Sequence, residues 1–178
     1  QISLYLRLGR IARDKLHEIS QSLEHYRKAL AYRSAQIDVL QEVQTLMLSI
    51  SDHEGFVHFC NEHLEKTNDP EAIEDTYRVL ARFLDKHAED PEKALEYWNY
   101  ILEEKEDPEA LQAVKTFAKA HDDKVGLADA LGRLAKCSND LETRRDLLIE
   151  QAEALAGQSN GNKKAITVLQ DVVDNVDR

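Results

Sequence analysis

Residues 77–104 read YRVLARFLDKHAEDPEKALEYWNYILEE, and this stretch decides the fold class of the chain. Both halves carry apolar residues at helical spacing, namely Tyr77, Leu80, Ala81 and Leu84, then Ala94, Leu95, Trp98, Ile101 and Leu102. Asp90-Pro91-Glu92 lies between them and marks a helix start. Proline loses no hydrogen bond at the first helical position, and the preceding aspartate can accept from free N–H groups. The stretch therefore predicts two amphipathic helices joined by a sharp turn.

The same hairpin recurs along the sequence. Asp69-Pro70-Glu71 and Asp107-Pro108-Glu109 repeat the helix-start signal. An alignment of the chain with itself that places Tyr5 on Tyr77 also places Leu8, Arg10, Leu23, Tyr26 and Leu30 on Leu80, Arg82, Leu95, Trp98 and Leu102. A second alignment, which places Leu40 on Leu111, repeats Gln41, Val43, Thr45 and Asp52 as Gln112, Val114, Thr116 and Asp123. The repeating unit is thus a pair of unlike hairpins, and a third copy begins near Leu148. A hairpin this short cannot bury its apolar stripe alone, so stacked copies must share a core.

This pattern resembles the tetratricopeptide repeat (TPR), whose first helix carries aromatic-x-x-Leu-Gly and whose second carries Ala-x-x-x-aromatic. Matching residues are Tyr5-Leu8-Gly9 with Ser22-Tyr26-Ala29, and Tyr77-Leu80-Ala81 with Ala94-Trp98-Ile101. The resemblance covers essentially the whole chain. The sequence departs from the family pattern in two ways. In these two hairpins the linker between the first and second helices is one residue longer, and the usual proline after the second helix is absent. The resemblance implies a right-handed superhelix whose first helices line a concave surface that holds a segment of another protein.

We therefore predict an all-α, right-handed α-solenoid of about five TPR-like hairpins, forming a single domain over residues 1–178 and cut from a longer array. The expected hairpins are 3–33, 36–67, 70–105, 108–137 and 141–176. Their expected helices are 3–16, 20–33, 36–50, 53–67, 70–87, 91–105, 108–121, 124–137, 141–157 and 163–176. Six glycines, three prolines and 32% charged residues suit a helical protein with solvated outer faces. Gly126 and Gly132 lie inside helix 124–137 and are expected to cost about 1 kcal/mol each, unless they permit close helix approach.

Composition and motifs exclude several classes of function. A net charge of −11 disfavours nucleic acid and anionic lipid as partners, and no stretch approaches the roughly 20 apolar residues of a membrane span. The glycines form no phosphate-binding loop, and no catalytic constellation is recognisable. Two cysteines, Cys60 and Cys137, are expected to be free thiols, which favours a reducing, cytoplasmic compartment, although a signal peptide upstream of Gln1 stays open.

The densest group of potential metal ligands is residues 53–63, which contain His53, His58, His63 and Cys60. On a helix His58 and His63 diverge by about 140°, whereas a metal-binding pair needs a spacing of three or four residues. We expect histidines on the polar face and a packed cysteine, with no metal, no cofactor and no enzymatic activity. Trp98 is expected to pack between neighbouring helices.

Two interpretations of function remain open. The first is a non-enzymatic protein–protein interaction scaffold, and the second is a regulatory or spacer segment of a larger enzyme or receptor. For the first, the inner face should carry a basic, amide-rich stripe that attracts an acidic segment. Its residues are Arg10, Arg13, Gln41, Gln44, Arg78, Arg82, Lys86, Gln112, Lys115 and Lys119. The alternative is that Glu74, Asp75, Asp85 and Asp122 neutralise these side chains in solvent.

Both ends of the chain carry more apolar surface than one packed side can cover. At the start these residues are Ile2, Leu4, Leu6 and Leu8, and in the last helix they are Val168, Leu169, Val172, Val173 and Val176. Solenoids need polar caps for solubility. We therefore expect further repeats beyond these residues or end-to-end self-association.

Overall fold

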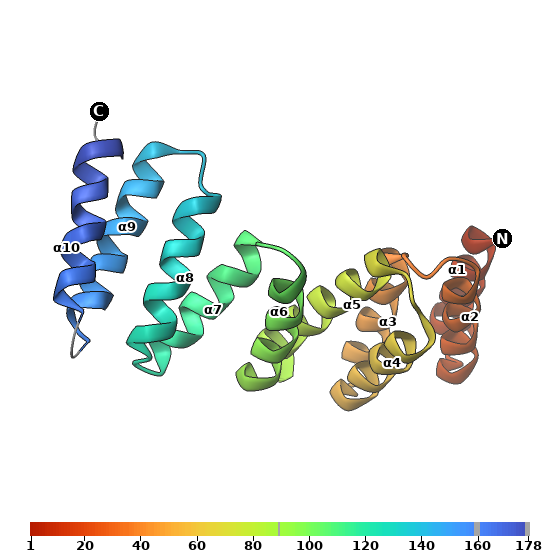
Figure 1. Ribbon diagram of the computed structural model, residues 1–178. Helices are drawn as coiled ribbons and strands as arrows, with labels where there is room; N and C mark the ends of the chain where they lie inside the picture. The colour runs from red at the N-terminus through yellow and green to blue at the C-terminus, as the bar shows by residue number, and fades with distance from the viewer. Residues whose placement is uncertain (89, 159–160, 177–178) are drawn as a thin grey trace. The chain divides into compact units, whose positions relative to one another are not determined.

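The computed structural model describes residues 1–88, 90–158 and 161–176, and over these residues the chain is helical and has no β-strand (Figure 1). Its ten α-helices follow one another as sequential hairpins. They are α1 (Ile2–Ile11), α2 (Ile19–Tyr32), α3 (Ile37–Ser49), α4 (His53–Lys66), α5 (Pro70–Phe83), α6 (Pro91–Glu104), α7 (Pro108–Ala120), α8 (Lys124–Cys137), α9 (Leu141–Ala156) and α10 (Asn162–Asp171). The all-α fold and the hairpin order are confirmed. None of the helices in these ranges combines the length and the apolar character that a membrane crossing requires.

Proline and aspartate define helix starts as the sequence predicts. Helices α5, α6 and α7 each begin at one of the three prolines. The Asp69 carboxylate accepts from the Glu71 N–H at 3.1 Å, and the Asp107 carboxylate accepts from the Ala110 N–H at 2.9 Å. Each cap satisfies an N–H group that has no partner within its own helix.

The extra residue expected in two linkers lies in the helices instead. Helices α1 and α5 continue into π-helical turns over Ala12–Leu16 and Leu84–Ala88, which correspond to each other in the alignment of Tyr5 with Tyr77. A π turn closes over five residues where an α turn closes over four, so it accommodates one more residue without a longer loop. His17 then ends the first of these turns in the left-handed conformation, with φ of 56°.

The chain divides into two compact units, residues 1–90 and 91–178, with the boundary between α5 and α6. Unit 1 contains α1 to α5, and unit 2 contains α6 to α10. The organisation of residues 1–178 as one domain, and the right-handed superhelix, stay predictions.

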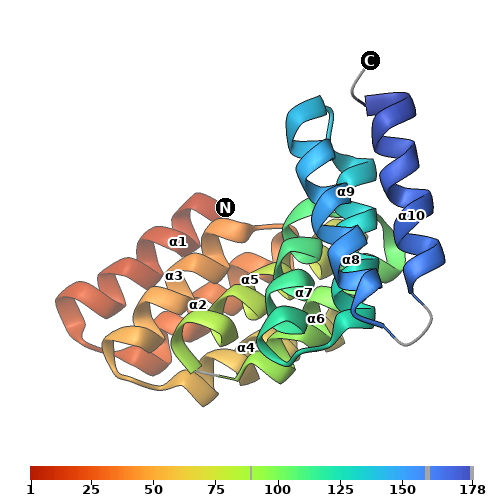
Figure 2. The same ribbon diagram turned by 90° about the vertical axis from the view of Figure 1, so that its left-hand side faces the viewer.

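In unit 1 the helices lie in two layers. The first helices of the hairpins, α1, α3 and α5, form one layer, and the second helices, α2 and α4, form the other (Figure 2). Between the layers lie large buried side chains, including Leu40, Leu80 and the rings of Phe56 and Phe83, whose centroids are 4.4 Å apart. Burial of these side chains drives the packing of unit 1.

Gly9 explains one element of the TPR-like pattern. A Cβ atom at Gly9 would lie 2.5 Å from Cε1 of Tyr26, whose side chain is fully buried. Ser22 Oγ also donates to the Gly9 carbonyl at 2.9 Å. Glycine is therefore needed at this position so that α1 and α2 can approach closely.

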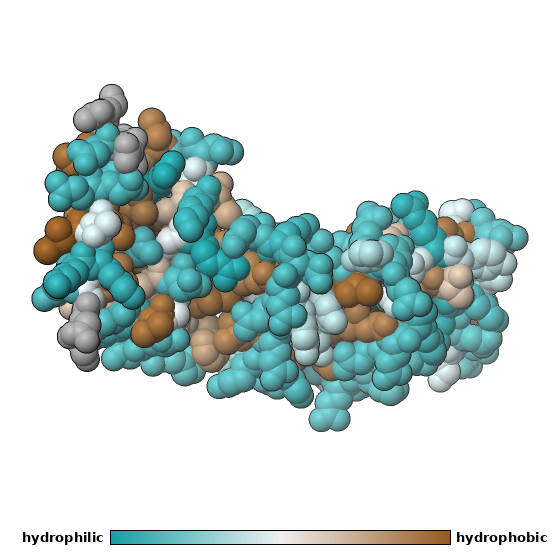
Figure 3. Space-filling model, in the orientation of Figure 1, coloured by the Kyte–Doolittle hydropathy of each residue, from teal (hydrophilic) through white to brown (hydrophobic). Residues whose placement is uncertain are grey.

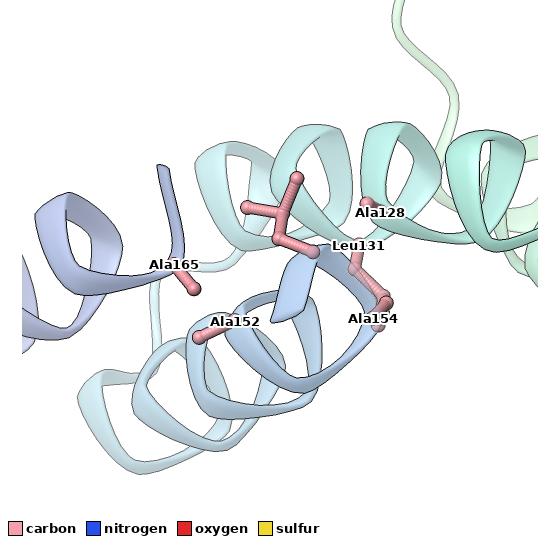
Figure 4. Close-up of a cluster of buried hydrophobic side chains, with 6 residues drawn as sticks. Ala128, Leu131, Ala152, Ala154 and Ala165 are labelled. Atoms are coloured by element: carbon pink, nitrogen blue, oxygen red, sulfur yellow. The ribbon is translucent and has the colours of Figure 1, made fainter. Parts of the chain in front are cut away.

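Unit 2 packs through small residues. Helices α8, α9 and α10 share a cluster of Ala128, Leu131, Ala152, Ala154, Leu155 and Ala165 (Figure 4). Gly132 belongs to the same interface, because a Cβ there would lie 2.3 Å from Nε2 of Gln151. Trp98 on α6 is 3% exposed, which confirms that it is buried.

The same N-terminal cap geometry explains two glycines near helix starts. Asp52 accepts from the Gly55 N–H at 2.8 Å, and Asp123, its counterpart in the alignment of Leu40 with Leu111, accepts from the Gly126 N–H at 3.0 Å. A Cβ at Gly55 or Gly126 would lie 2.2 or 2.4 Å from the capping carboxylate. These glycines therefore belong to the caps. Helix 124–137, which the two glycines were expected to destabilise, forms over its full predicted length.

Apolar surface remains on α1 and α10. Leu4 and Ile11 are exposed on α1, and Ile166 and Leu169 are exposed on α10. Val172 is buried, so the predicted apolar face of the last helix is only partly open, and the side chain of Val176 lies outside the described residues. Figure 3 shows apolar surface interspersed with polar surface over α9 and α10. End-to-end association stays a prediction.

Candidate functional site

In unit 1 two predicted stripe residues bridge neighbouring first helices. Arg10 Nη2 lies 2.6 Å and Arg13 Nη1 lies 2.7 Å from the two carboxylate oxygens of Glu42 on α3. Arg13 also pairs with Asp14. Burial acts to raise the pKa of Glu42, but the hydrogen bonds from both arginines outweigh it and hold that pKa below its ordinary value. Both arginines thus face the seam between α1 and α3.

The other stripe residues of unit 1 lie on α3 and α5. Gln41 is exposed and Gln44 is half-buried. On α5, Arg78 Nη2 lies 2.9 Å from Glu74 Oε1, and the Arg78 side chain is 14% exposed, whereas Arg82 and Lys86 are exposed.

Asp75 lies within the acidic part of α5. Burial raises its pKa, and Glu71 and Glu74 raise it further, while Arg78 opposes them. Of the acids expected to neutralise the stripe, Glu74 pairs with a stripe cation, Arg78.

Unit 2 repeats the bridging arrangement with lysines. Lys115 and Lys119 on α7 lie 3.5 and 3.3 Å from the carboxylate oxygens of Glu150 on α9. Gln112 is exposed one turn before Lys115. In each unit, therefore, two cations of one first helix share a single carboxylate of the next first helix.

Sequence reasoning missed the two bridging carboxylates. Glu42 lies 29 residues from Arg13, and Glu150 lies 31 residues from Lys119. The predicted partners were instead acids close in sequence. An alignment of each first helix with the next one in the sequence could have identified Glu42 and Glu150, because each carboxylate lies about one hairpin after the cations that it pairs with.

The predicted histidine-rich segment separates in space. His58 is exposed and Cys60 is fully buried, as expected, and His53 packs edge-on against Phe83 with ring centroids 5.6 Å apart. His63 is buried, so the expectation that the histidines lie on the polar face is wrong for this residue. Burial raises the pKa of the Cys60 thiol, and Cys60 and Cys137 are both free. Within the described ranges no three His, Cys, Asp or Glu side chains are placed to hold a metal ion.

A second surface was not predicted from the sequence. A groove of about 930 Å³ lies in the second-helix layer of unit 1, along α2 and α4. On its wall the Arg27 guanidinium lies 5.2 Å from the centroid of the Phe59 ring and pairs with Glu62 at 2.9 Å. Lys66 pairs with the same carboxylate at 2.7 Å.

Solved structures identify the fold. No protein-family model and no curated protein matches the sequence. The crystal structure of MamA protein has a TM-score of 0.52 and 10% identity, covering 97% of this chain and 90% of that chain. YrrB, a TPR protein with an unusual peptide-binding site, has a TM-score of 0.52 and 16% identity, covering 98% of this chain and 86% of that chain. PilF of Pseudomonas aeruginosa has a TM-score of 0.55 and 18% identity, covering 97% of this chain and 76% of that chain. The fold is therefore TPR-like.

Proposed function

We propose that this chain is a non-enzymatic scaffold that binds an acidic segment of another protein on the first helices of a unit. These helices are the first-helix layer, α1, α3 and α5 in unit 1 and α7 and α9 in unit 2. The TPR-like fold supports this proposal, and so does YrrB, a TPR protein of similar fold that has a peptide-binding site. The observation that carries it is the recurrent bridge, in which two cations of one first helix face one carboxylate of the next.

These cations retain binding capacity. A guanidinium has five N–H donors and an ammonium has three, whereas each bridge uses only some of them. Arg10 is half exposed, and Lys119 has 69% of its side chain exposed. In unit 2 the two lysines also exceed their shared carboxylate by one positive charge. An acidic segment can therefore bind beside Glu42 or Glu150 without displacing them, and the exposed amides of Gln41 and Gln112 can hydrogen-bond its backbone.

The test is binding of fluorescein-labelled acidic peptides to the wild type and to an Arg82→Glu, Lys119→Glu double mutant across a salt series. We expect the double mutant to bind at least about tenfold more weakly, with a shallower salt dependence, because two attractive charges become repulsive. A Lys136→Glu, Lys164→Glu double mutant is the matched control. It makes the same charge change at exposed positions on α8 and α10, which are second helices.

Equal affinity and equal salt slope in the wild type and the Arg82→Glu, Lys119→Glu mutant would exclude the first-helix layer. If the control mutant loses as much affinity, the loss follows from making the net charge of −11 more negative, wherever the charges are placed. That result would also contradict the proposal.

A further inference from the structure

The groove along α2 and α4 contains a buried polar group without a partner. His63 lines the groove and is 8% exposed, and its Nε2 has no hydrogen-bond partner among the described residues. Buried polar atoms in native proteins are nearly always paired, because an unpaired one has lost water and gained nothing in return. Burial lowers the pKa of His63, whereas a hydrogen bond with the Ser34 backbone acts to raise it.

The internal repeat supplies a comparison. The alignment of Leu40 with Leu111 places His63 of α4 on Leu134 of α8, which is also 8% exposed. An apolar side chain therefore fills the same position of the same hairpin in unit 2. Phe59 similarly corresponds to Ala130, and Arg27 corresponds to Asn99 in the alignment of Tyr5 with Tyr77. The histidine, the ring and the cation that build this groove are specific to unit 1.

The charges of the groove favour an anionic ligand. Each of its three carboxylates is already engaged, Glu24 by Lys28, Glu62 by Arg27 and Lys66, and Asp69 by the hydroxyl of Ser34. Arg33 also lines the groove, is exposed, and has no ion pair with another residue of the described ranges. With four cations against three acids, the groove is positive in a chain of net charge −11.

We propose that this groove binds an extended acidic segment of another protein in which acidic and apolar side chains alternate. A carboxylate of the segment pairs with Arg33, and an apolar side chain packs against Leu30 and Phe59. The His63 Nε2 atom is covered by its neighbours, so the imidazole turns towards the groove to bind a backbone group of the segment. Alternate side chains of an extended segment point to opposite sides, which suits a groove with an apolar floor and a charged rim. This site lies in the second-helix layer of unit 1 and is independent of the first-helix layer proposed above.

The experiment uses a fluorescein-labelled peptide of alternating Asp and Leu residues, with Asn/Leu and Asp/Ser peptides as comparisons. The variants are His63→Leu, which copies the residue of unit 2, and Arg33→Glu. Lys136→Glu is the matched control, because it makes the same charge change on the exposed end of α8. Thermal unfolding is measured for every variant.

We expect the Asp/Leu peptide to bind the wild type, and both comparison peptides to bind at least about tenfold more weakly. His63→Leu should weaken binding by a similar factor, and its thermal unfolding checks that the variant is folded, because leucine fills the same position in unit 2. Arg33→Glu should weaken binding and flatten its salt dependence. Lys136→Glu and the Arg82→Glu, Lys119→Glu mutant should bind this peptide like the wild type.

Wild-type affinity in both His63→Leu and Arg33→Glu would overturn the proposal. Equal binding of the Asp/Ser peptide would also overturn it, by showing that charge alone attracts the ligand. A loss confined to the Arg82→Glu, Lys119→Glu mutant would assign the peptide to the first-helix layer, and would refute this site while supporting the proposed function.

Discussion

At the scale of single residues, Gly9 shows how one missing Cβ sets a helix–helix distance. Replacing Gly9 with alanine would improve helix propensity by about 1 kcal/mol, but the new Cβ would lie 2.5 Å from the buried Tyr26 ring. We expect Gly9→Ala to destabilise the protein by about 1–3 kcal/mol, as overpacking does elsewhere. Urea unfolding checks this value.

Gly157→Ala is the matched control for that substitution. Gly157 is exposed at the end of α9 with φ of −73°, and its Cβ would meet only the flexible side chain of Lys124. This variant should be as stable as the wild type or slightly more stable. If Gly9→Ala is equally stable, the close approach of α1 and α2 does not require glycine.

At the scale of the helix, α8 depends on its N-terminal cap. Asp123 accepts from the N–H groups of Val125 and Gly126 at 3.1 and 3.0 Å, and the same helix contains Gly126 and Gly132. We expect Asp123→Ala to cost about 1 kcal/mol, and no more than about 2 kcal/mol. Equilibrium unfolding in urea measures this loss.

Asp123→Asn separates the cap from its charge. Asparagine keeps the side-chain oxygen that accepts the two hydrogen bonds, so this variant should retain most of the stability. If the alanine and asparagine variants lose the same amount, the contribution of Asp123 is electrostatic and the cap geometry is not its cause.

At the scale of the whole molecule, the ion pairs predict how stability responds to acid. Hydrogen bonds from Lys66 and Arg27 lower the pKa of Glu62 from 4.5 to about 2. The stabilisation from this carboxylate is complete above the ordinary pKa and is lost as the pH falls from about 4.5 towards about 2. Glu42 shifts in the same direction, whereas Asp75, whose pKa is raised, favours the folded state as the pH falls.

We therefore expect the thermal midpoint to fall between about pH 6 and about pH 3, and to fall less in Glu62→Gln, which cannot be protonated in this range. Glu62→Gln should also have the lower midpoint of the two proteins at about pH 6, because the ion pairs are gone. A pH dependence identical to that of the wild type would show that Glu62 contributes nothing to acid stability. Glu54→Gln, an exposed position on the same helix, is the control.

The sequence by itself determined the helices and their order. Apolar periodicity, the Asp-Pro-Glu starts and the two internal alignments are local or repetitive signals, so helix bounds followed from them without knowledge of packing. The sequence also indicated one additional residue near Leu16, between the two helices of the first hairpin. Only the structure shows that a π-helical turn accommodates this residue.

The tertiary structure alone decided which side chains meet. Glu42 and Glu150 bridge to cations about one hairpin away in sequence, and His63 of α4 lines one groove with residues of α2. Helical periodicity predicts which face of its helix a residue occupies. Its neighbour across the interface, however, depends on the axial offset between successive hairpins. Within a hairpin, the approach of the two helices likewise depends on fits such as that of the Tyr26 ring against Gly9, which appear in no pattern of polar and apolar residues.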